Sequence, residues 1–388
     1  MIKNMVVKNL LINTVFRVIS LINRMIPKDE NRILLYSDMG FRDNIKSIYD
    51  YMIDKGYNQK YTIIRSQKEH EKGKLPVNVK VAGNISGILC YLRCGHVFYA
   101  FGKLPIYPRK GQRVVQMWHG APFKGIDIRQ KKEHNGNRKR CYYTNVLVTG
   151  EVFSSVFAGI FSCDKKTISI CGQPRTDMMV HPYEIRRSGC KKLVLWLPTF
   201  RKSEALGYCD SSTKSILPVI KESELPMLDE LLGKMEMILY VKLHPLQDCG
   251  EWEKKENPFR YIYIRSHGRF SRDNLDLYRL LGCADALITD YSSVFYDYML
   301  MNRPIGFTED DIKEYNERRG FVVDDPDYFK TGARLNTYDG IVEFLQSVAD
   351  GRDEWKEKRE KVNREVNYYR DFDNRKRALN IGGVYYNE

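Results

Sequence analysis

Several catalytic signatures are missing from this 388-residue sequence. There is no G-x-G-x-x-G and no G-x-x-x-x-G-K-[ST], which argues against a dinucleotide-dependent dehydrogenase and a P-loop NTPase. There is also no H-E-x-x-H and no cluster of carboxylates, which argues against a metal-dependent hydrolase. The sequence therefore predicts neither a bound metal nor a cofactor.

Closely spaced cysteines are almost absent as well. None of the nine cysteines forms a Cys-x-x-Cys pair, and Cys90 with Cys94 is the only close pair. This spacing supports neither a zinc site nor a disulfide framework. We therefore expect a reducing, cytoplasmic compartment.

The first 26 residues lack acidic side chains and long apolar runs. Lys3, Lys8, Arg17 and Arg24 interrupt every apolar stretch before it reaches the ~20 residues needed to span a bilayer. Apolar residues nevertheless recur at helical spacing, at Leu11, Val15, Val18, Ile19, Ile22 and Ile26. Residues 1–27 are therefore predicted to form an amphipathic helix. It either packs on the body of the protein or, as we favour, lies on an anionic membrane surface.

Basic residues dominate the charge. The 63 Lys and Arg exceed the 49 Asp and Glu, for a formal net charge of +14. Such a balance favours a polyanionic partner, which can be nucleic acid, anionic lipid or a phosphate-rich substrate. No RNP, KH or zinc motif is present, so a nucleic-acid partner is not expected.

The apolar pattern predicts an α/β protein. Short β-rich segments alternate with helix-length segments from residue 32 to about 172 and again from 193 to 307, with a polar break at 181–192. This predicts two Rossmann-like domains that face each other across a cleft. The predicted ranges are 28–185 for the N-terminal domain, 186–350 for the C-terminal domain and 351–388 for a charged, solvated helical segment that packs across both.

Polar residues follow four of the predicted strands. In an open α/β sheet such residues meet at one crevice, where cations and hydroxyls suit a ligand that carries phosphates. Ser292 or Ser293 would also begin a helix, so that free backbone N–H groups point at an anion. The candidates are His119 and Lys124; Thr199 and Arg201; Lys242 and His244; and Thr289, Asp290, Ser292 and Ser293.

Two histidines stand out among the seven. A histidine at a strand end is often a structural residue, which remains the alternative for each of them. His119 and His244, however, occupy matching strand ends in the two predicted domains. An imidazole with a pKa near ~6.5 is suited to removing a hydroxyl proton at neutral pH, so both are predicted to be catalytic.

A basic run lies just beyond His119. Residues 129–140, "RQKKEHNGNRKR", contain six Lys or Arg and one Glu. The run is either a solvated loop or a track for a polyphosphate acceptor or anionic headgroups. On the second interpretation Lys124, Arg129, Lys131 and Lys132 contact the acceptor or another polyanion.

Five motifs together resemble one family. The segments "HGAPFKGID", "GQPRTD", "LPTFR", "KLHP" and "ADALITDYSSVFYDYMLMNRPIGF" resemble the CDP-glycerol glycerophosphotransferases, the polymerases and primases of teichoic-acid synthesis. The resemblance extends from about residue 113 to about residue 322. It implies a GT-B fold and transfer of an alditol phosphate from a CDP-linked donor to a hydroxyl of a lipid-linked or polymer acceptor, with release of CMP. It also implies a peripheral protein on the cytoplasmic face of the bacterial membrane, active in wall or capsular polymer synthesis.

The resemblance further implies roles for the strand-end residues. His119 would be the general base for the acceptor hydroxyl. His244 and Arg201 would contact the donor pyrophosphate and stabilise the leaving CMP, and Thr289, Asp290, Ser292 and Ser293 would hold donor phosphates. Thr199 and Lys242 lie in the same two donor motifs.

Two alternatives remain open. One is a GT-B glycosyltransferase that uses a nucleotide sugar, similar to bacterial polysialyltransferases. The other is a non-catalytic module that binds phosphorylated polymers or anionic membranes through its basic surface.

Overall fold

The computed structural model describes residues 5–38, 40–66, 74–102, 104–125, 141–183, 189–199, 202–203, 208–209, 217–245, 247 and 257–386. The chain forms two compact units. The first contains Met1–His119, His134–Asp177 and Tyr368–Glu388, and the second contains Gly120–Glu133 and Met178–Asn367. The chain thus leaves the first unit directly after His119. The predicted domain ranges 28–185, 186–350 and 351–388 are continuous. They therefore do not include the placement of Gly120–Glu133 in the second unit and of Tyr368–Glu388 in the first.

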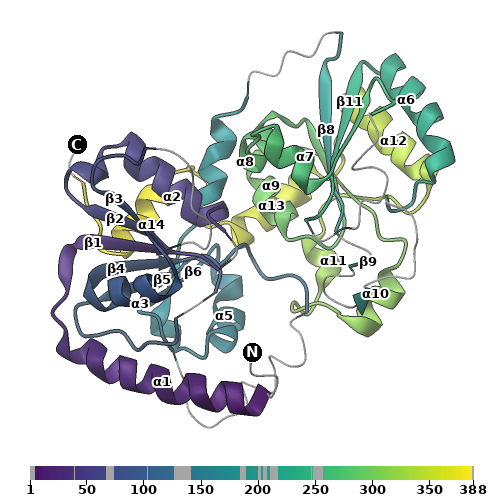
Figure 1. Ribbon diagram of the computed structural model, residues 1–388. Coiled ribbons are helices and arrows are strands. Elements are labelled where there is room, and N and C mark those ends of the chain that lie inside the picture. The colour runs from purple at the N-terminus through teal and green to yellow at the C-terminus, as the bar shows by residue number, and fades with distance from the viewer. Residues whose placement is uncertain are drawn as a thin grey trace. The chain divides into compact units, whose positions relative to one another are not determined.

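The first unit is built on a parallel sheet of seven strands, in the order β3-β2-β1-β4-β5-β6-β7 (Figure 1). Each strand coincides with a segment predicted from the apolar pattern. The strands are β1 (Asp29–Tyr36), β2 (Thr62–Ser66), β3 (Val79–Ala82), β4 (Cys94–Tyr99), β5 (Arg113–Gln116), β6 (Asn145–Val148) and β7 (Ile168–Ile170).

Helices cover this sheet, and an apolar core lies beneath them. Ile45 and Ile48 of α2 (Asp43–Asp54) and Leu379 of α14 (Asn374–Ile381) belong to one buried cluster with Ile33 and Phe98 of the sheet. The remaining helices are α3 (Asn84–Arg93), α5 (Ser154–Ile160) and the 3₁₀ segments η1 (Tyr57–Gln59), η2 (Glu151–Phe153), η3 (Lys165–Thr167) and η4 (Pro174–Val180).

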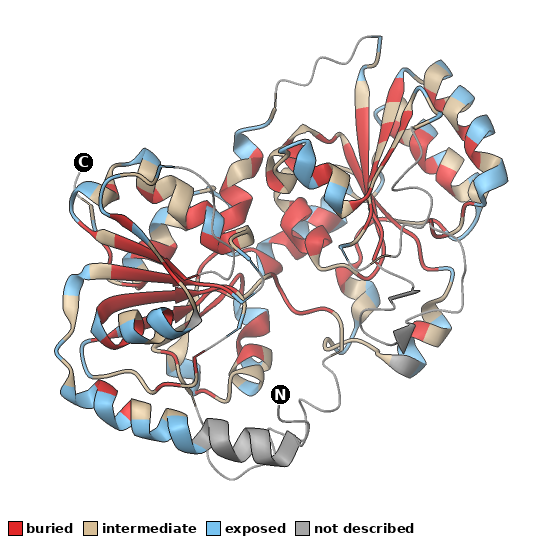
Figure 2. Ribbon diagram, in the orientation of Figure 1, coloured by how far each residue is buried: buried red, intermediate tan, exposed pale blue. Residues whose placement is uncertain are grey.

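The second unit contains a parallel sheet in the order β12-β11-β8-β13-β14-β15. Figure 2 shows the strands of both sheets mostly in red, because each sheet is covered by helices and its strands are buried. The strands are β8 (Lys192–Leu197), β11 (Met237–Lys242), β12 (Ile262–Arg265), β13 (Ala286–Thr289), β14 (Ile305–Phe307) and β15 (Ala333–Arg334). A two-stranded ribbon of β9 (Lys202–Ser203) and β10 (Tyr208–Cys209) accompanies them.

Amphipathic helices close the core of the second unit. Leu228 and Leu232 of α6 (Leu225–Lys234) and Ile341 and Leu345 of α12 (Tyr338–Ala349) are fully buried in one cluster with Trp196 of β8. The other helical segments are η5 (Glu222–Glu224), α7 (His267–Arg272), α8 (Leu277–Cys283), α9 (Val294–Tyr298), η7 (Met299–Met301), α10 (Ile312–Arg318), α11 (Pro326–Phe329) and α13 (Lys356–Val366).

The C-terminal segment is divided between the units. It was predicted to be charged, helical and solvated, but it forms two helices, α13 in the second unit and α14 in the first. Arg359 of α13 is fully buried and forms an ion pair with Asp353. Its guanidinium group also donates to Asn302, so this charged helix is anchored from within.

The predicted N-terminal helix is present as α1 (Met5–Met25). Among its residues 14–25, whose burial is described, the buried ones are Ser20 and Asn23. Asn23 is fully buried and donates to the Tyr107 carbonyl and to Gln112 Oε1, both at 3.0 Å. Ser20 accepts from the backbone N–H of Tyr107 at 3.1 Å. No helix in the described part of the chain is long and apolar enough to cross a bilayer.

Candidate functional site

His119 lies three residues beyond β5, in a short aromatic stack. Its ring is parallel to that of Phe101, with centroids 4.8 Å apart, and it also stacks on Trp118 at 4.1 Å. Trp118 has φ +56, a left-handed conformation that a bulky residue rarely adopts. The chain therefore turns sharply at Trp118, and the turn places the imidazole between the two rings.

Hydrogen bonds from distant segments hold this turn. Asn44, fully buried in the first turn of α2, donates to the Trp118 carbonyl at 2.9 Å and to Gln173 Oε1 at 2.6 Å. Asn44 also accepts from the backbone N–H of Arg175 at 3.1 Å. Three segments thus meet at the end of β5, and each hydrogen bond restricts the position of His119.

Charged residues surround the imidazole. One terminal nitrogen of Arg175, Nη1, donates to both oxygens of Asp43, at 2.7 and 2.8 Å, in a charge-assisted ion pair. Burial lowers the pKa of His119 to about 4, the Asp43 carboxylate raises it, and Arg175 lowers it. Near neutral pH the ring is therefore uncharged, which is the state in which it can accept a proton.

The motif that begins at His119 continues into the second unit. Phe123 is buried there against Phe295, with ring centroids 4.9 Å apart, and its carbonyl accepts from the N–H of Val322 at 3.0 Å. Gly125 donates to the Gly320 carbonyl at 2.7 Å, and a Cβ at Gly125 would lie 2.1 Å from the Arg319 carbonyl oxygen. Glycine is required at this position because the two backbones approach so closely.

Lys124 lies within this pairing. It forms an isolated antiparallel bridge with Phe321 and is half-buried. The backbone of Lys124 is thus part of the fold of the second unit. Its contact with an acceptor stays a prediction.

Three of the predicted donor-binding residues build the fold of the second unit. The Asp290 carboxylate accepts from the backbone N–H of Thr199 at 2.7 Å and from its hydroxyl at 3.0 Å. Thr289 donates to the Leu197 carbonyl at 2.9 Å. Thr289 and Asp290 are fully buried and Thr199 is 8% exposed. These side chains join the ends of β8 and β13, and their predicted contact with phosphate stays a prediction.

Ser292 and Ser293 are placed differently. Both are half-buried, and Ser293 is the N-cap residue of α9 without a side-chain capping bond. Ser292 Oγ lies 3.5 Å from the backbone nitrogen of Val294. Hydroxyl and N–H groups are therefore gathered at the carboxyl end of β13, where an anion would be stabilised.

Lys242 and His244 lie at the carboxyl end of β11, the neighbour of β8. His244 lies two residues beyond the strand and is half-buried. Lys242 is the last residue of the strand, and its Nζ lies 5.1 Å from the centre of the Phe270 ring in α7. Donor binding by His244 and Lys242 stays a prediction. The predicted residues Arg201, Arg129, Lys131 and Lys132 lie outside the described residues.

Sequence analysis assigned no role to several residues around His119. Asp43, Asn44 and Phe101 lie in segments far from His119 in the sequence. Arg175 belongs to the quoted segment "GQPRTD", which was the one available signal. No group of three or more His, Cys, Asp and Glu side chains within the described ranges is placed to hold a metal ion.

The loop after α11 contains a buried ion pair. Lys330 is buried and contacts Glu309 Oε1 at 2.6 Å and Asp327 Oδ1 at 2.9 Å. Arg334 of β15 also contacts Glu309, at 3.1 Å. These ion pairs connect the carboxyl end of β14 to the edge of the sheet.

Comparison with known proteins identifies the family. The profile of the CDP-Glycerol:Poly(glycerophosphate) glycerophosphotransferase family matches residues 18–381. The chain belongs to this family. The predicted family is thereby confirmed, and membership extends well beyond the segment from 113 to 322 that carried the resemblance.

Curated relatives include polymerases and primases. The chain is 27% identical to a teichoic acid poly(glycerol phosphate) polymerase of Staphylococcus epidermidis over 74% of this chain and 41% of that protein. It is 30% identical to a teichoic acid glycerol-phosphate primase of Bacillus subtilis over 55% of this chain and 54% of that protein. It therefore spans about half the length of these two relatives. A polymerase of Bacillus spizizenii matches at 27% identity over 86% of each chain.

Solved structures support the fold. The chain matches the wall teichoic acid polymerase TagF with a TM-score of 0.66 and 20% identity, over 97% of this chain and 94% of that chain. A variant of the same polymerase, soaked with CDPG, gives a TM-score of 0.70. The α/β, GT-B-like fold class is therefore confirmed.

Proposed function

We propose that this protein transfers glycerol phosphate, or a related alditol phosphate, from a CDP-linked donor to a hydroxyl of a lipid-linked or polymer acceptor in teichoic-acid-like or capsular polymer synthesis. The observation that carries this proposal is the imidazole of His119, uncharged and fixed between two aromatic rings, in a chain that matches the family over residues 18–381. A neutral, positioned imidazole can accept the hydroxyl proton, and the Asp43 carboxylate, which raises the pKa of His119, stabilises the charge that the ring then gains.

The proposed reaction proceeds in one displacement. His119 takes the proton of the acceptor hydroxyl, and the acceptor oxygen attacks the phosphorus that carries the alditol. The bond from that phosphorus to the bridging oxygen breaks, and CMP leaves with the bonding electrons. The products are a new phosphodiester, CMP and a proton on His119, which is then released to solvent.

Negative charge grows on the leaving phosphate in this step. Ser292 and Ser293, with the N–H groups at the start of α9, bind donor phosphates, and His244 and Arg201 stabilise the leaving CMP. Fixed donors of this kind stabilise the transition state because they are oriented before the reaction begins. No bound metal is needed for this scheme.

CMP release tests the proposal. We expect the wild-type protein to release CMP from CDP-glycerol or CDP-ribitol in the presence of a lipid-linked or synthetic hydroxyl acceptor, and His119→Gln to release almost none. Consumption of a nucleotide sugar without CMP release from either CDP-alditol would contradict the proposal and favour a GT-B glycosyltransferase. Equal CMP release by wild type and His119→Gln would remove the general base from the scheme.

The proposed place of action is the cytoplasmic face of the membrane, reached through α1. This helix is attached by polar residues, and it exposes the apolar side chains of Val15, Val18, Leu21, Ile22 and Met25, of which Met25 is 80% exposed. Figure 2 shows its described part mostly in pale blue. Arg17 and Arg24 are exposed beside them, which suits anionic lipid.

Vesicle binding tests this part of the proposal. We expect Leu21→Glu to reduce co-sedimentation with phosphatidylglycerol vesicles strongly, because it places a charge in the apolar face of α1. Met227→Glu is the matched control, since Met227 is 51% exposed on α6. Equal binding by both variants and the wild type would return α1 to a purely structural role.

A further inference from the structure

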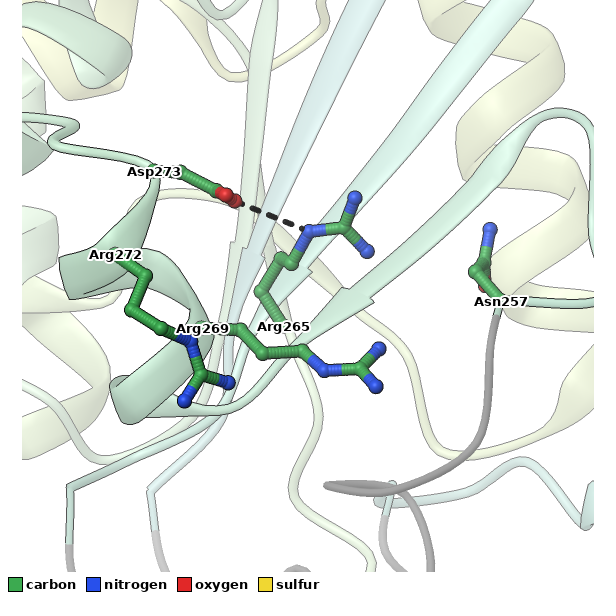
Figure 3. A pocket seen from close by; sticks show the side chains of 5 residues that line it. All are labelled: Asn257, Arg265, Arg269, Arg272 and Asp273. Atoms are coloured by element: carbon green, nitrogen blue, oxygen red, sulfur yellow. Dashed lines mark ion pairs between the residues drawn. The ribbon is translucent and has the colours of Figure 1, made fainter.

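A pocket lined by arginines lies beside β12, the edge strand of the second sheet. It has a volume of about 320 Å³ and is lined by Asn257, Arg265, Arg269, Arg272 and Asp273 (Figure 3). This volume is at the lower end of the range of small-molecule sites. None of the site residues discussed above lines it.

Secondary structure explains why the arginines gather. Arg265 is the last residue of β12, Ser266 caps the next helix through its side chain, and Arg269 and Arg272 follow in α7. Residues three apart on a helix lie on the same side, so Arg269 and Arg272 are neighbours. Figure 3 shows that Arg265 and Arg269 extend toward the side where Asn257 lies, while Arg272 extends downward and lies farther from it.

Positive charge predominates among the described residues of the pocket. They carry three guanidinium groups and one carboxylate, a net of two positive charges among these five residues. Asp273 contacts Arg265 Nε at 3.4 Å, and no carboxylate of the described residues forms an ion pair with Arg269. A surface of this kind attracts an anion, and the planar guanidinium groups match the oxygens of a phosphate.

Asn257 supplies a different polar group. Its side-chain nitrogen donates to the carbonyls of Phe259, at 2.9 Å, and Ile262, at 2.7 Å, which fixes the orientation of the amide. Its Oδ1 is buried and accepts no hydrogen bond within the described part of the chain. A buried acceptor without a donor is costly, and a ligand hydroxyl would satisfy it.

The lining therefore suits a phosphate ester of a polyol. Its described residues include no aromatic or aliphatic side chain, so they offer neither a nucleobase nor an acyl chain a stacking or apolar surface. In the sheet order, β11 and β8 separate β12 from β13. With a strand spacing of ~4.8 Å, the pocket edge is about 14 Å from the strand that carries the proposed donor phosphates.

We propose that this pocket binds a phosphodiester of an acceptor chain that already carries several polyol phosphate units. The inference rests on the proposed function, in which the donor pyrophosphate occupies the ends of β8 and β13. An acceptor with several units has further phosphates outside the reaction centre, and the arginine pocket binds one of them. The protein thus favours lengthening a polymer over adding the first unit.

Binding without a donor tests the pocket directly. We expect a synthetic glycerol phosphate hexamer to bind the wild-type protein about tenfold more tightly than Arg269→Gln in calorimetric titrations, because the variant loses a charge-assisted hydrogen bond. Arg260→Gln is the matched control: Arg260 is exposed, precedes β12 and does not line the pocket. Its affinity should equal that of the wild type.

Turnover then connects the pocket to acceptor length. Arg269→Gln should lower kcat/KM for hexamer acceptors about tenfold and leave kcat/KM for single-unit acceptors and the KM for the donor unchanged. Equal hexamer affinity in wild type and Arg269→Gln, equal losses in Arg260→Gln, or no hexamer binding would overturn the inference. So would a loss of binding to phosphatidylglycerol vesicles, with hexamer affinity intact, in Arg269→Gln. Absence of CMP release with every acceptor would count against the proposed function alone.

Discussion

The carboxyl ends of the two sheets use polar side chains in different ways. In the first unit, Asn44 and Arg175 are buried supports, and together they present one half-buried imidazole, that of His119. In the second unit, Thr289 and Asp290 are the buried supports, and half-buried serines follow them at the start of α9. The comparison teaches that a polar residue at a strand end can hold the fold together through buried hydrogen bonds. We expect the half-buried residues, rather than these supports, to react or bind.

The largest expected effect is on turnover in the first unit. His119→Gln should lower kcat by about 10² to 10⁴-fold, the usual contribution of a general base, without a large change in thermal stability. His96→Gln is the matched control, because the two ring nitrogens of His96 face backbone carbonyls, those of Gly382 at 2.7 Å and Glu30 at 3.0 Å. His96→Gln should lower stability and retain turnover. Lost stability with retained turnover in His119→Gln, and lost turnover in His96→Gln, would contradict these two roles.

The next effect is on stability in the second unit. Lys330→Met should lower the free energy of unfolding by about 1–3 kcal/mol, because buried Glu309 loses one of its two cationic partners and keeps Arg334. Denaturant unfolding would measure this loss. Lys358→Met, at an exposed position of α13, is the control and should change stability little. Equal stability of Lys330→Met and wild type would show that this ion pair is not a support.

Variants of Asp290 and Ser292 test which residues of one motif stabilise the fold and which bind the donor. Asp290→Ala should lower the free energy of unfolding by about 1–3 kcal/mol, because Thr199 loses the acceptor of its N–H and its hydroxyl. Ser292→Ala should retain stability and raise the KM for the CDP-linked donor roughly tenfold. Denaturant unfolding and initial rates on the two variants would measure both effects. A stability loss in Ser292→Ala with unchanged KM would make this serine a support.

The smallest effect concerns pH. The pKa of His119 is lowered to about 4 in the folded protein, from an ordinary value near 6.5. Between these pH values the unfolded chain binds more protons, so the contribution of His119 to stability rises with pH across this window and is complete above it. Activity that depends on the neutral ring should therefore fall only below about pH 5. NMR titration of the imidazole would measure the pKa directly, and a value of 6 or more would contradict the burial argument.

Asp43 sharpens the same prediction. Its carboxylate raises the pKa of His119, so Asp43→Asn should lower that pKa further. If Asp43 only anchored Arg175, its loss would instead release Arg175, which lowers the pKa of His119, and that pKa would rise. Measurement of the imidazole titration in both proteins would separate an electrostatic role from a structural one.

Much of the architecture followed from local sequence. The apolar segments predicted as strands coincide with β1 to β8 and β11 to β14, because strands buried in a parallel sheet are near-continuous apolar runs. β15 was missed, since Ala333–Arg334 is too short to carry such a run. The charged C-terminal segment was predicted as one solvated region, yet Arg359 is fully buried, a fact that depends on Asp353 and Asn302.

The sequence by itself determined the α/β class, the family motifs and the two histidines at strand ends, because these depend on residues close together in the chain. Only the tertiary structure decided which polar side chains became supports. Thr199 and Asp290 are 91 residues apart, and Asn44 and Gln173 are 129 apart, yet each pair is joined by a buried hydrogen bond. Likewise, the amphipathic pattern of α1 predicted its helix but not that Ser20 and Asn23 would be buried. Hydrogen bonds and burial depend on neighbours in space, and for these residues the neighbours are distant in sequence.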